Sequence, residues 1–520
     1  MKSFHLPLLV ALLAAARVNA QDGWLNFRGD LQRTGSAAKL KPWDKRVAWQ
    51  RPLLMDKLDG FPDAEPEDAA KALIEKLRRD ADPTILPGAF PIIVGDTCNY
   101  ATYRSIVSVA VQPITFLDKE SDTKTVVKAG EITWKSIPQN RSLSMMLEKN
   151  NTRPAMNKIV EMLQETKQDR WLWANPTIGS LSSDGKTVFT VNDSVFPAIE
   201  IRKLTPLPRG LGEIIRPFLM QSDLIAYHAR HGKGLWDADG NDFDREQSLV
   251  RSYFLGAPVS HAGKLFGVNE KKDELRLLRI DPAPKEGNFN INLETTLAIA
   301  KIPAAEQIPL RPLRRTQPLH IALAGDTLVC PTHAGVIVGV ERAKMAVRWT
   351  YRYREETTAP PALPHWQAAC PIVGKDRIVF TAADAPEVHC LDFDGKKQWT
   401  AARDDDLYLA TVHDDIVFLV GKKDCRALNL KDGTEKWRIA MGLPAGVGVK
   451  DGATYYLPLK VDADTKGPTL WAIDLAKGKK VERLAVPYPD ALGNLALHRG
   501  LFVSQSVTHV AAFPLAAVSK

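Results

Sequence analysis

The chain has 520 residues, 45% of them apolar, and a formal net charge of +8. This apolar content is that of a globular protein and argues against a chain that is disordered throughout. Its basic residues are spread thinly and are not interleaved with stacking aromatic residues, so we expect no nucleic-acid partner.

The first twenty residues have the pattern of a secretory signal peptide. Lys2 gives a basic start, residues 6–16 form an apolar run, and residues 18–20 end it where a signal peptidase reads small residues. The run is shorter than the ~20 residues that cross a bilayer, although an uncleaved anchor is the alternative. We expect cleavage before Gln21 and a soluble, exported protein, periplasmic or extracellular, that does not span a membrane.

Two early stretches show helical rather than strand spacing. Apolar residues recur three and four positions apart near residues 64–80, behind an acidic first turn, and again near residues 154–168. We interpret both as short helical insertions between strands. Such insertions either bind a partner or cover an apolar rim.

A turn motif recurs along the chain, in which a tryptophan follows a glycine by four residues. It occurs at Gly130–Trp134, Gly232–Trp236, Gly395–Trp399 and Gly433–Trp437. Short apolar runs typical of strands precede it, as in residues 388–393 and 426–430. Glycine suits a positive φ angle in a tight hairpin. We expect the tryptophan on the next strand, with its ring buried between neighbouring sheets.

The same pattern continues where the letters differ, which gives eight anchor positions. They are Trp49, Trp134, Trp236, Ile291, Trp349, Trp399, Trp437 and Glu482, with Met345 in the glycine position before Trp349. One anchor for every four short strands is typical of a β-propeller. We therefore predict an all-β fold, an eight-bladed β-propeller of four-stranded blades, as a single domain over residues 47–520.

The two ends of the chain complete one blade. Residues 495–497, 501–504 and 509–513 have the pattern of three strands with no anchor strand after them, and the strand around Trp49 has no three strands before it. Pairing them would remove two open sheet edges. We predict a ring closed by its N- and C-terminal strands, with residues 21–46 as an N-terminal extension.

The repeat, best preserved in residues 391–399 and 427–437, resembles the PQQ-like repeat of the quinoprotein alcohol dehydrogenase-like superfamily. The segments 24–35, 254–258 and 328–335 are similar to parts of uncharacterised secreted bacterial members. The resemblance covers the chain apart from the insertions and implies an eight-bladed propeller. It implies less about activity, because some members are dehydrogenases that bind PQQ and Ca²⁺ on the axis and others are non-catalytic assembly platforms.

The enzymes of that superfamily carry an adjacent Cys-Cys disulfide, a Ca²⁺-binding Glu and Asn, and a catalytic Asp. The five cysteines here are all separate: Cys98, Cys330, Cys370, Cys390 and Cys425. No Glu, Asn and Asp set aligns with this chain. We expect the cysteines to be small core residues, at least one of them unpaired, and we assign no catalytic residue, no metal ligand and no bound cofactor.

Two motifs could bind a metal. The acidic run Asp237–Glu246 resembles a calcium loop, but Gly240 stands fourth where the EF-hand pattern needs glycine sixth. A solvated blade loop is the favoured interpretation. His228 and His231 follow a turn register that places His228 on a strand and His231 in the bend, which favours surface histidines over a metal pair.

Two further motifs match known functional patterns, but we favour interpretations in which they have no such function. Arg28-Gly29-Asp30 has the letters of a cell-adhesion motif, but it belongs to the segment that resembles the family opening. The sequons at Asn140, Asn150 and Asn192 are coincidental in a bacterial protein.

We therefore predict a non-enzymatic exported propeller whose loops and insertions bind a partner protein or an envelope polymer. A periplasmic PQQ- and Ca²⁺-dependent dehydrogenase with an atypical site is the alternative. A hydrolase that uses carboxylates of the funnel face is a third interpretation. No motif specifies the partner, the functional face or the oligomeric state.

Overall fold

The computed structural model describes twelve parts of the chain. They are residues 23–37, 49–53, 82–118, 123–136, 173–193, 221–238, 248–284, 290–308, 312–355, 370–484, 486 and 492–514. The predicted signal peptide (1–20) and the predicted helical insertions near 64–80 and 154–168 lie outside these residues.

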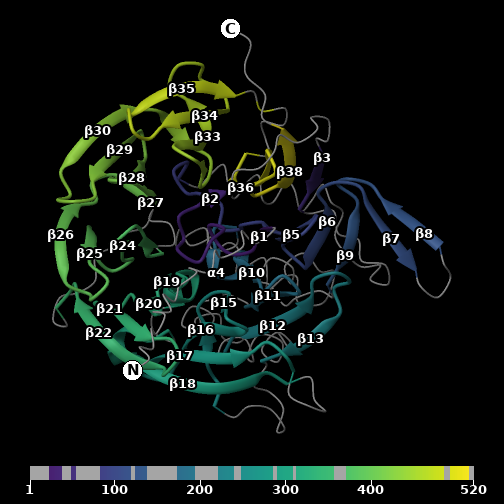
Figure 1. Ribbon diagram of the computed structural model, residues 1–520, viewed down its shortest axis with the longest axis horizontal. Coiled ribbons are helices and arrows are strands. Elements are labelled where there is room, and N and C mark those ends of the chain that lie inside the picture. The colour runs from purple at the N-terminus through teal and green to yellow at the C-terminus, as the bar shows by residue number, and fades with distance from the viewer. Residues whose placement is uncertain are drawn as a thin grey trace, which may run out of the picture.

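The described strands form eight blade sheets arranged radially around one axis (Figure 1) and one separate two-stranded sheet. Blade 1 contains β4 (Ile92–Val94), β5 (Thr97–Ala101), β6 (Ile106–Ala110) and β9 (Ile132–Lys135). Blade 2 contains β10 (Leu181–Ser183), β11 (Thr187–Asn192), β12 (Asp223–His228) and β13 (Gly234–Asp237). Blade 3 contains β14 (Tyr253–Phe254), β15 (Val259–His261), β16 (Lys264–Lys271), β17 (Glu274–Asp281) and β18 (Asn292–Lys301). Blade 4 contains β19 (Ala322–Ala324), β20 (Thr327–Pro331), β21 (Val336–Glu341) and β22 (Ala346–Arg352).

The second half of the ring repeats this arrangement. Blade 5 contains β23 (Ile372–Val373), β24 (Ile378–Thr381), β25 (Glu387–Leu391) and β26 (Lys397–Ala402). Blade 6 contains β27 (Asp406–His413), β28 (Ile416–Gly421), β29 (Asp424–Asn429) and β30 (Glu435–Ala440). Blade 7 contains β31 (Gly442–Pro444), β32 (Val449–Asp451), β33 (Thr454–Asp462), β34 (Thr469–Asp474) and β35 (Lys479–Leu484). Blade 8 contains β36 (Asn494–His498), β37 (Leu501–Gln505), β38 (His509–Pro514) and β3 (Trp49–Pro52). The predicted eight-bladed propeller is confirmed.

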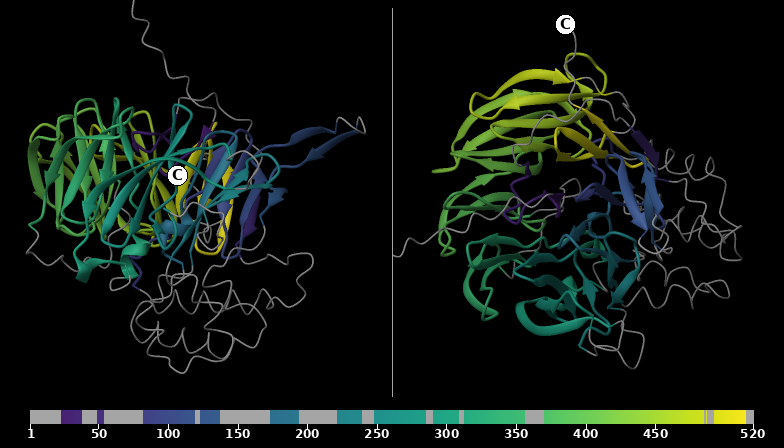
Figure 2. Two further views of the ribbon diagram at one scale, coloured as in Figure 1. Left: turned by 90° about the horizontal axis from the view of Figure 1, so that it is seen from below. Right: turned by 45° about the vertical axis from the view of Figure 1, so that its right-hand side comes forward.

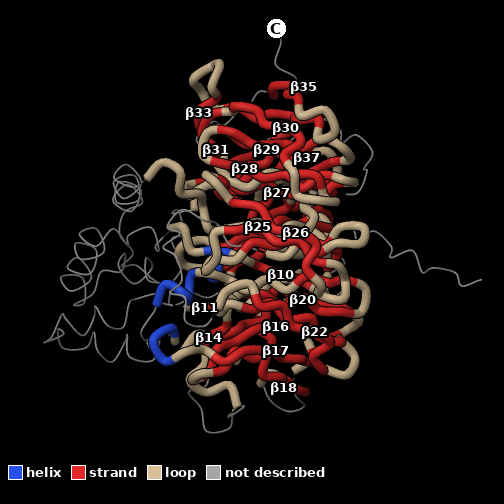
Figure 3. The backbone as a smooth tube through the Cα atoms, turned by 90° about the vertical axis from the view of Figure 1, so that its left-hand side faces the viewer, coloured by secondary structure: helices blue, strands red, loops and turns tan. Residues whose placement is uncertain are grey.

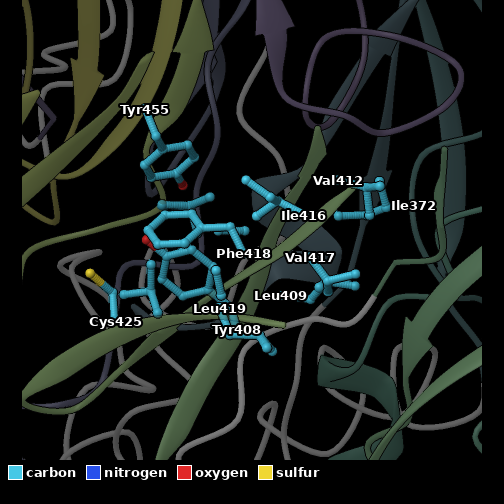
Figure 4. Packing of buried hydrophobic residues seen from close by; sticks show 14 of the residues in the cluster. Ile372, Tyr408, Leu409, Val412, Ile416, Val417, Phe418, Leu419, Cys425 and Tyr455 are labelled. Carbon is cyan, nitrogen blue, oxygen red and sulfur yellow. The ribbon is translucent and has the colours of Figure 1, made fainter. Parts of the chain in front are cut away.

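The core lies between neighbouring blades. Every residue of β28 is buried, whereas the outer strand β30 alternates exposed and half-buried residues. The difference arises because an inner strand has a blade on each side, so both of its faces must be apolar. Figure 4 shows the packing around blade 6, where the rings of Phe418 and Tyr455 meet edge to face with centroids 5.0 Å apart.

The Gly-Trp motif joins five pairs of neighbouring blades. The indole of Trp399 in blade 5 lies against Gly433 of blade 6 and donates a hydrogen bond from Nε1 to the carbonyl of Leu430 (2.8 Å). A Cβ atom at Gly433 would stand 2.6 Å from that ring, and the φ angle there is +76°. Glycine is therefore required at this position for two reasons: the bend needs a positive φ angle, and the indole ring leaves no room for a Cβ atom. The same contact joins Trp49 to Gly130, Trp134 to Gly232, Trp349 to Gly395, and Trp437 to Gly478.

One of the eight predicted anchors was wrong. Motif tryptophans stand opposite the third strand just before a β-bulge, as Trp399 does opposite Cys390. In blade 3 that position is Thr295, opposite Arg279, whereas Ile291 precedes β18. The connection between β17 and β18 is longer than the corresponding connections of blades 2 and 4 to 7, so the four-residue spacing that gave Ile291 stops short of the strand.

The repeats that lack the glycine or the tryptophan of the motif agree with the structure. Met345, assigned to the glycine position, has a φ angle of +52°. Glu482 of β35 stands opposite Ala472 of β34, as a motif tryptophan would.

The ring closes as predicted. β3 pairs antiparallel with β38, with Trp49 opposite Ala512, so the chain's beginning supplies the outer strand of the blade formed by its end. This pairing leaves no blade with a missing outer strand and holds the ring by backbone hydrogen bonds between its two ends.

Residues 23–37 lie inside the ring, near its axis (Figure 1). β1 (Gly23–Trp24) adds an inner strand to blade 1, and β2 (Ser36–Ala37) pairs parallel with β32 of blade 7. Between them, the carbonyls of Leu25, Leu31 and Gln32 accept backbone hydrogen bonds from blades 2, 4 and 5 at 2.8 to 3.0 Å. The segment thus contacts the inner strands of most blades, which the sequence did not predict.

Candidate functional site

The two faces of the ring carry different connections. In each blade, the links from the second to the third strand and from the outer strand to the next blade leave at one face, and the other links leave at the opposite face. The first face carries the long connections, which are residues 53–91, 136–180, 193–222, 238–252, 302–321 and 353–371. We call it the long-connection face and the other one, which has mostly tight turns, the turn face.

The short helices belong to the long-connection face. They are α4 (Pro176–Gly179), η2 (Ala304–Glu306) and η3 (Pro312–Thr316), and Figure 3 shows them gathered on one side of the strands. Binding sites of propellers and other rigid scaffolds are found preferentially on such connections, because the strands hold the loops in place.

A pocket of about 290 Å³ opens on the long-connection face, over blades 7, 8 and 1. Its walls are proline-rich and present polar and apolar surface in about equal parts, with one cation and one carboxyl group. The lining residues are Asp82, Pro83, Ile85, Pro87, Trp173, Pro444, Ala445, Lys460, Pro468, Leu492 and Val507. The volume lies at the lower end of the range for small-molecule sites. A pocket of this size fits one or two side chains of a partner.

Asn494 holds the walls of this pocket together. Its side chain is fully buried, donates from Nδ2 to the carbonyls of Pro87 (2.8 Å) and Ala89 (2.7 Å), and accepts a hydrogen bond at Oδ1 from the amide of Val447 (2.9 Å). One amide therefore links blade 8 to the connections that enter blades 1 and 7. Because each of these groups is satisfied by Asn494, the pocket is preformed.

Close backbone packing joins two connections next to the pocket. A Cβ atom at Gly88 would lie 2.4 Å from the amide nitrogen of Asn175. Asn175 in turn caps α4, accepting a hydrogen bond from the amide of Thr177 (3.0 Å). Only glycine allows the two connections to approach this closely.

A buried network of charges occupies the same face over blades 3 to 5. Arg314 donates to Glu270 (3.2 Å), and Arg354 donates to both Asp384 (3.1 Å) and Glu306 (3.3 Å). Burial raises the pKa of Glu270, and the Arg314 guanidinium opposes that shift. All five side chains are close to fully buried, so the network fastens the connections 302–321 and 353–371 to the ring.

A second buried ion pair lies over blades 2 and 3. Arg315 makes a two-point contact with Asp193, with one hydrogen bond of 3.0 Å from Nε, and its guanidinium stands 4.7 Å from the ring centre of Tyr253. Both charged side chains are at most 2% exposed. This pair joins η3 to the connection that leaves β11.

Two buried histidines lie beside these networks. Burial lowers the pKa of His333 to about 4, and its Nδ1 accepts a hydrogen bond from the amide of Ala383 (3.3 Å). Burial also lowers the pKa of His320, whose ring stacks on Phe27 with centroids 4.0 Å apart. Both imidazoles are therefore neutral at physiological pH.

Two arginines anchor the segment on the axis. Arg33 is 2% exposed and donates to the carbonyls of Ile321 (2.9 Å) and Phe27 (2.7 Å). Arg28 donates to the carbonyl of Leu409 and to Sγ of Cys370 (3.8 Å). The axis, where the family resemblance implies a quinone and a calcium ion, is lined in the described residues by backbone and guanidinium groups.

The described residues do not match the donor set that PQQ and Ca²⁺ would need there. The five cysteines are all buried and unpaired, each in a different place. Within the described part of the chain, no three His, Cys, Asp or Glu side chains are placed to hold a metal ion. The prediction that the cysteines are core residues, at least one of them unpaired, is confirmed.

The histidine motif lies on the turn face. The rings of His228 and His231 stack with centroids 3.7 Å apart, and Nδ1 of His228 accepts a hydrogen bond from the amide of Arg230 (3.2 Å). His228 ends β12 and His231 is in the turn, as predicted. Partial burial, His231 and Arg230 lower the pKa of His228.

The other sequence motifs are placed as follows. Arg28 of the Arg28-Gly29-Asp30 motif is 7% exposed and Asn192 is 6% exposed, so neither offers its side chain to a receptor or a glycan. Most of the acidic run, residues 239–247, lies outside the described residues, as do Asn140 and Asn150.

Sequence reasoning missed the pocket and its central residue. Asn494 is one polar residue at the start of a short strand. Two of its hydrogen-bond partners, Pro87 and Ala89, lie about 400 positions away in the sequence. The only signal was the number of prolines in the connections, which by itself indicates loops and not a common site.

Comparisons with known proteins support the fold. Residues 362–509 match a family model described as outer membrane protein assembly factor BamB. No curated protein matches the chain. Among solved structures, the crystal structure of BamB from Moraxella catarrhalis is 13% identical, with 84% of this chain and 96% of that chain covered and a TM-score of 0.42. A europium-containing methanol dehydrogenase is 10% identical, with 94% and 90% covered and a TM-score of 0.51.

At such identities the methanol dehydrogenase shows a common fold alone. Together with the family-model match, it confirms that the chain resembles the PQQ-like repeat propellers. No helix in the described residues has the length and apolar character needed to cross a bilayer.

Proposed function

We propose that this propeller of PQQ-like repeats is a non-catalytic, exported platform that binds a partner protein or an envelope polymer at its long-connection face. The observation that carries the proposal is the preformed, proline-walled pocket of about 290 Å³ on that face. Its rigid proline walls suit an anchor side chain of a partner, because a preformed pocket needs little ordering when it binds.

The match of residues 362–509 to the BamB family model supports a binding role. That segment supplies six of the eleven residues that line the pocket: Pro444, Ala445, Lys460, Pro468, Leu492 and Val507. The matched segment therefore forms about half of the pocket.

The alternative is a PQQ- and Ca²⁺-dependent dehydrogenase, which the similarity to a methanol dehydrogenase favours only through the fold. The arginines and backbone of residues 23–37 on the axis support the non-catalytic proposal. Mixing purified protein with PQQ and Ca²⁺ tests this point. A saturable change in visible absorbance, together with dye reduction that depends on an alcohol or a sugar, would overturn the proposal.

The binding proposal is tested by filling the pocket. The Ala445→Phe variant places a ring in the cavity, and Ala453→Phe is its matched control, because Ala453 is exposed in a tight turn of the same blade at the turn face. Both proteins are expressed in the native envelope, cross-linked and purified by a C-terminal tag, and the bound partners are quantified.

We expect Ala445→Phe to lose at least ten-fold of the cross-linked partner and Ala453→Phe to keep it. Equal recovery with both variants would contradict a partner site at the pocket. The N-terminal sequence of the protein recovered from the periplasm checks export, and it should begin at Gln21.

A further inference from the structure

A β-hairpin stands apart from all eight blades. β7 (Ile114–Asp118) and β8 (Thr123–Val127) pair only with each other, with Ile114 opposite Val127. Figure 2 shows the hairpin projecting away from the ring beside blade 1. Its base is held at the turn face, where the amide of Val111 donates to the carbonyl of Asp96 (2.8 Å). It is therefore separate from the pocket on the long-connection face.

The outer edge of β8 has no partner strand among the described residues. An isolated two-stranded hairpin is only marginally stable in water. Its edge presents backbone N–H and C=O groups at the spacing of a sheet ladder, which is the pattern that another extended chain can pair with.

The side chains of β8 specify what such a chain must carry. Lys124 and Val126 are two residues apart on β8 and therefore share one face, and Lys128 is the first residue after the strand. All three are exposed, Val126 to 58%. Neither lysine forms an ion pair with another described residue. The backbone amide of Lys128 does donate to the Glu131 carboxylate (2.7 Å).

This pattern disfavours a second copy of the chain paired antiparallel about Val126. If two β8 edges paired antiparallel about Val126, Lys124 of each copy would stand directly opposite Lys128 of the other. Like charges placed directly opposite each other destabilise a ladder. A strand with acidic residues two positions on either side of an apolar residue would instead pair each carboxylate with a lysine and the apolar residue with Val126.

We propose that the outer edge of β8 is a docking site for an extended polypeptide strand of the pattern acidic, any, apolar, any, acidic. Backbone hydrogen bonds provide the affinity, and the two lysines select the acidic strand and its register. The site is a second binding surface, on the opposite face from the pocket of the proposed function.

The probe is a fluorescent seven-residue peptide with the sequence Thr-Glu-Thr-Val-Thr-Glu-Thr. Its binding to the full chain is followed by fluorescence anisotropy, and hydrogen exchange of residues 123–128 is followed by mass spectrometry. We expect saturable binding at low salt and slower exchange of the β8 amides. A matched peptide with lysine in place of both glutamates should bind at least ten-fold more weakly.

Charge reversal gives the sharpest test. The double variant Lys124→Glu and Lys128→Glu should lose the acidic peptide by at least ten-fold and gain the lysine peptide by a similar factor. Lys397→Glu is the matched control, because Lys397 is exposed on the outer strand of blade 5 without a described ion pair. It should bind the acidic peptide as the unmodified chain does. The exchange of preference keeps the test valid even if the variant hairpin is less stable.

The proposal would be overturned by equal binding of both peptides, by no binding at millimolar peptide, or by unchanged exchange of residues 123–128. It would also be overturned if backbone N-methylation of the peptide left its affinity unchanged, because such a peptide cannot form the ladder. Ala445→Phe should not affect the peptide. Loss of the partner without loss of the peptide, or the reverse, therefore separates the two surfaces.

Discussion

Replacing Gly433 by alanine should destabilise the ring far more than the same change at a matched turn. At Gly433 the new Cβ would lie 2.6 Å from the indole of Trp399, and the φ angle is +76°. The positive φ angle costs about 1–2 kcal/mol for an alanine. Forcing the indole away costs about a further 1–3 kcal/mol through overpacking. We therefore expect a loss of about 2–5 kcal/mol in the free energy of unfolding.

Gly452 provides the control for this experiment. Its φ angle is +58°, and a Cβ atom added there would have no other atom within 4 Å. Gly452→Ala should therefore lose only the backbone contribution of about 1–2 kcal/mol. Any gain from a less flexible unfolded chain is common to both variants and cancels in their difference. Urea unfolding, followed by tryptophan fluorescence and by circular dichroism, measures both free energies when the two signals coincide.

A second background tests the cause directly. In a Trp399→Leu chain the indole is absent, so adding Gly433→Ala should cost about as much as Gly452→Ala does. If the cost of Gly433→Ala is the same with and without the indole, the packing of Trp399 against Gly433 does not explain the motif.

Three further outcomes are expected. Arg33→Met should lower the free energy of unfolding by about 2–5 kcal/mol, because two carbonyls inside the ring lose their buried partner. Urea unfolding measures this loss. A loss of less than about 1 kcal/mol would contradict a stabilising role of residues 23–37. His333 has a pKa lowered to about 4 in the folded chain, so the native state binds fewer protons than the unfolded state between pH ~4 and ~6.5. Its stabilising contribution is complete above pH ~6.5 and is lost as the pH falls toward ~4, by up to about 3 kcal/mol, and His333→Gln should flatten this dependence in urea titrations at several pH values. Deleting residues 494–520 removes three strands of blade 8 and should unfold the whole ring in one step, whereas a trimmed but folded ring, seen by circular dichroism and proteolysis, would show that closure is not needed.

The local pattern of the chain was enough to predict the blades. A buried inner strand must be apolar on both faces, and the bend before each outer strand needs a positive φ angle. Both requirements therefore produce a sequence pattern at a fixed spacing. Met345 shows that the bend persists without glycine. Ile291 shows where the counting fails, because a longer turn displaced the outer strand of blade 3.

The candidate site was not predictable in the same way. The pocket draws its walls from residue 82 to residue 507, and Asn494 joins segments about 400 positions apart in the chain. No periodicity records such a contact, since it depends on which connections the closed ring brings together.

The amino-acid sequence by itself determined the repeating unit, the number of blades and the pairing of the chain's two ends, because hydrophobic alternation and turn geometry act between residues that are close in sequence or that complete a repeat. Only the tertiary structure decided what fills the axis, which face carries the pocket and that β8 has no partner at its outer edge among the described strands. Those features result from closing a ring of fixed radius, where distant connections converge and where a segment such as residues 23–37 either fits among the inner strands or does not.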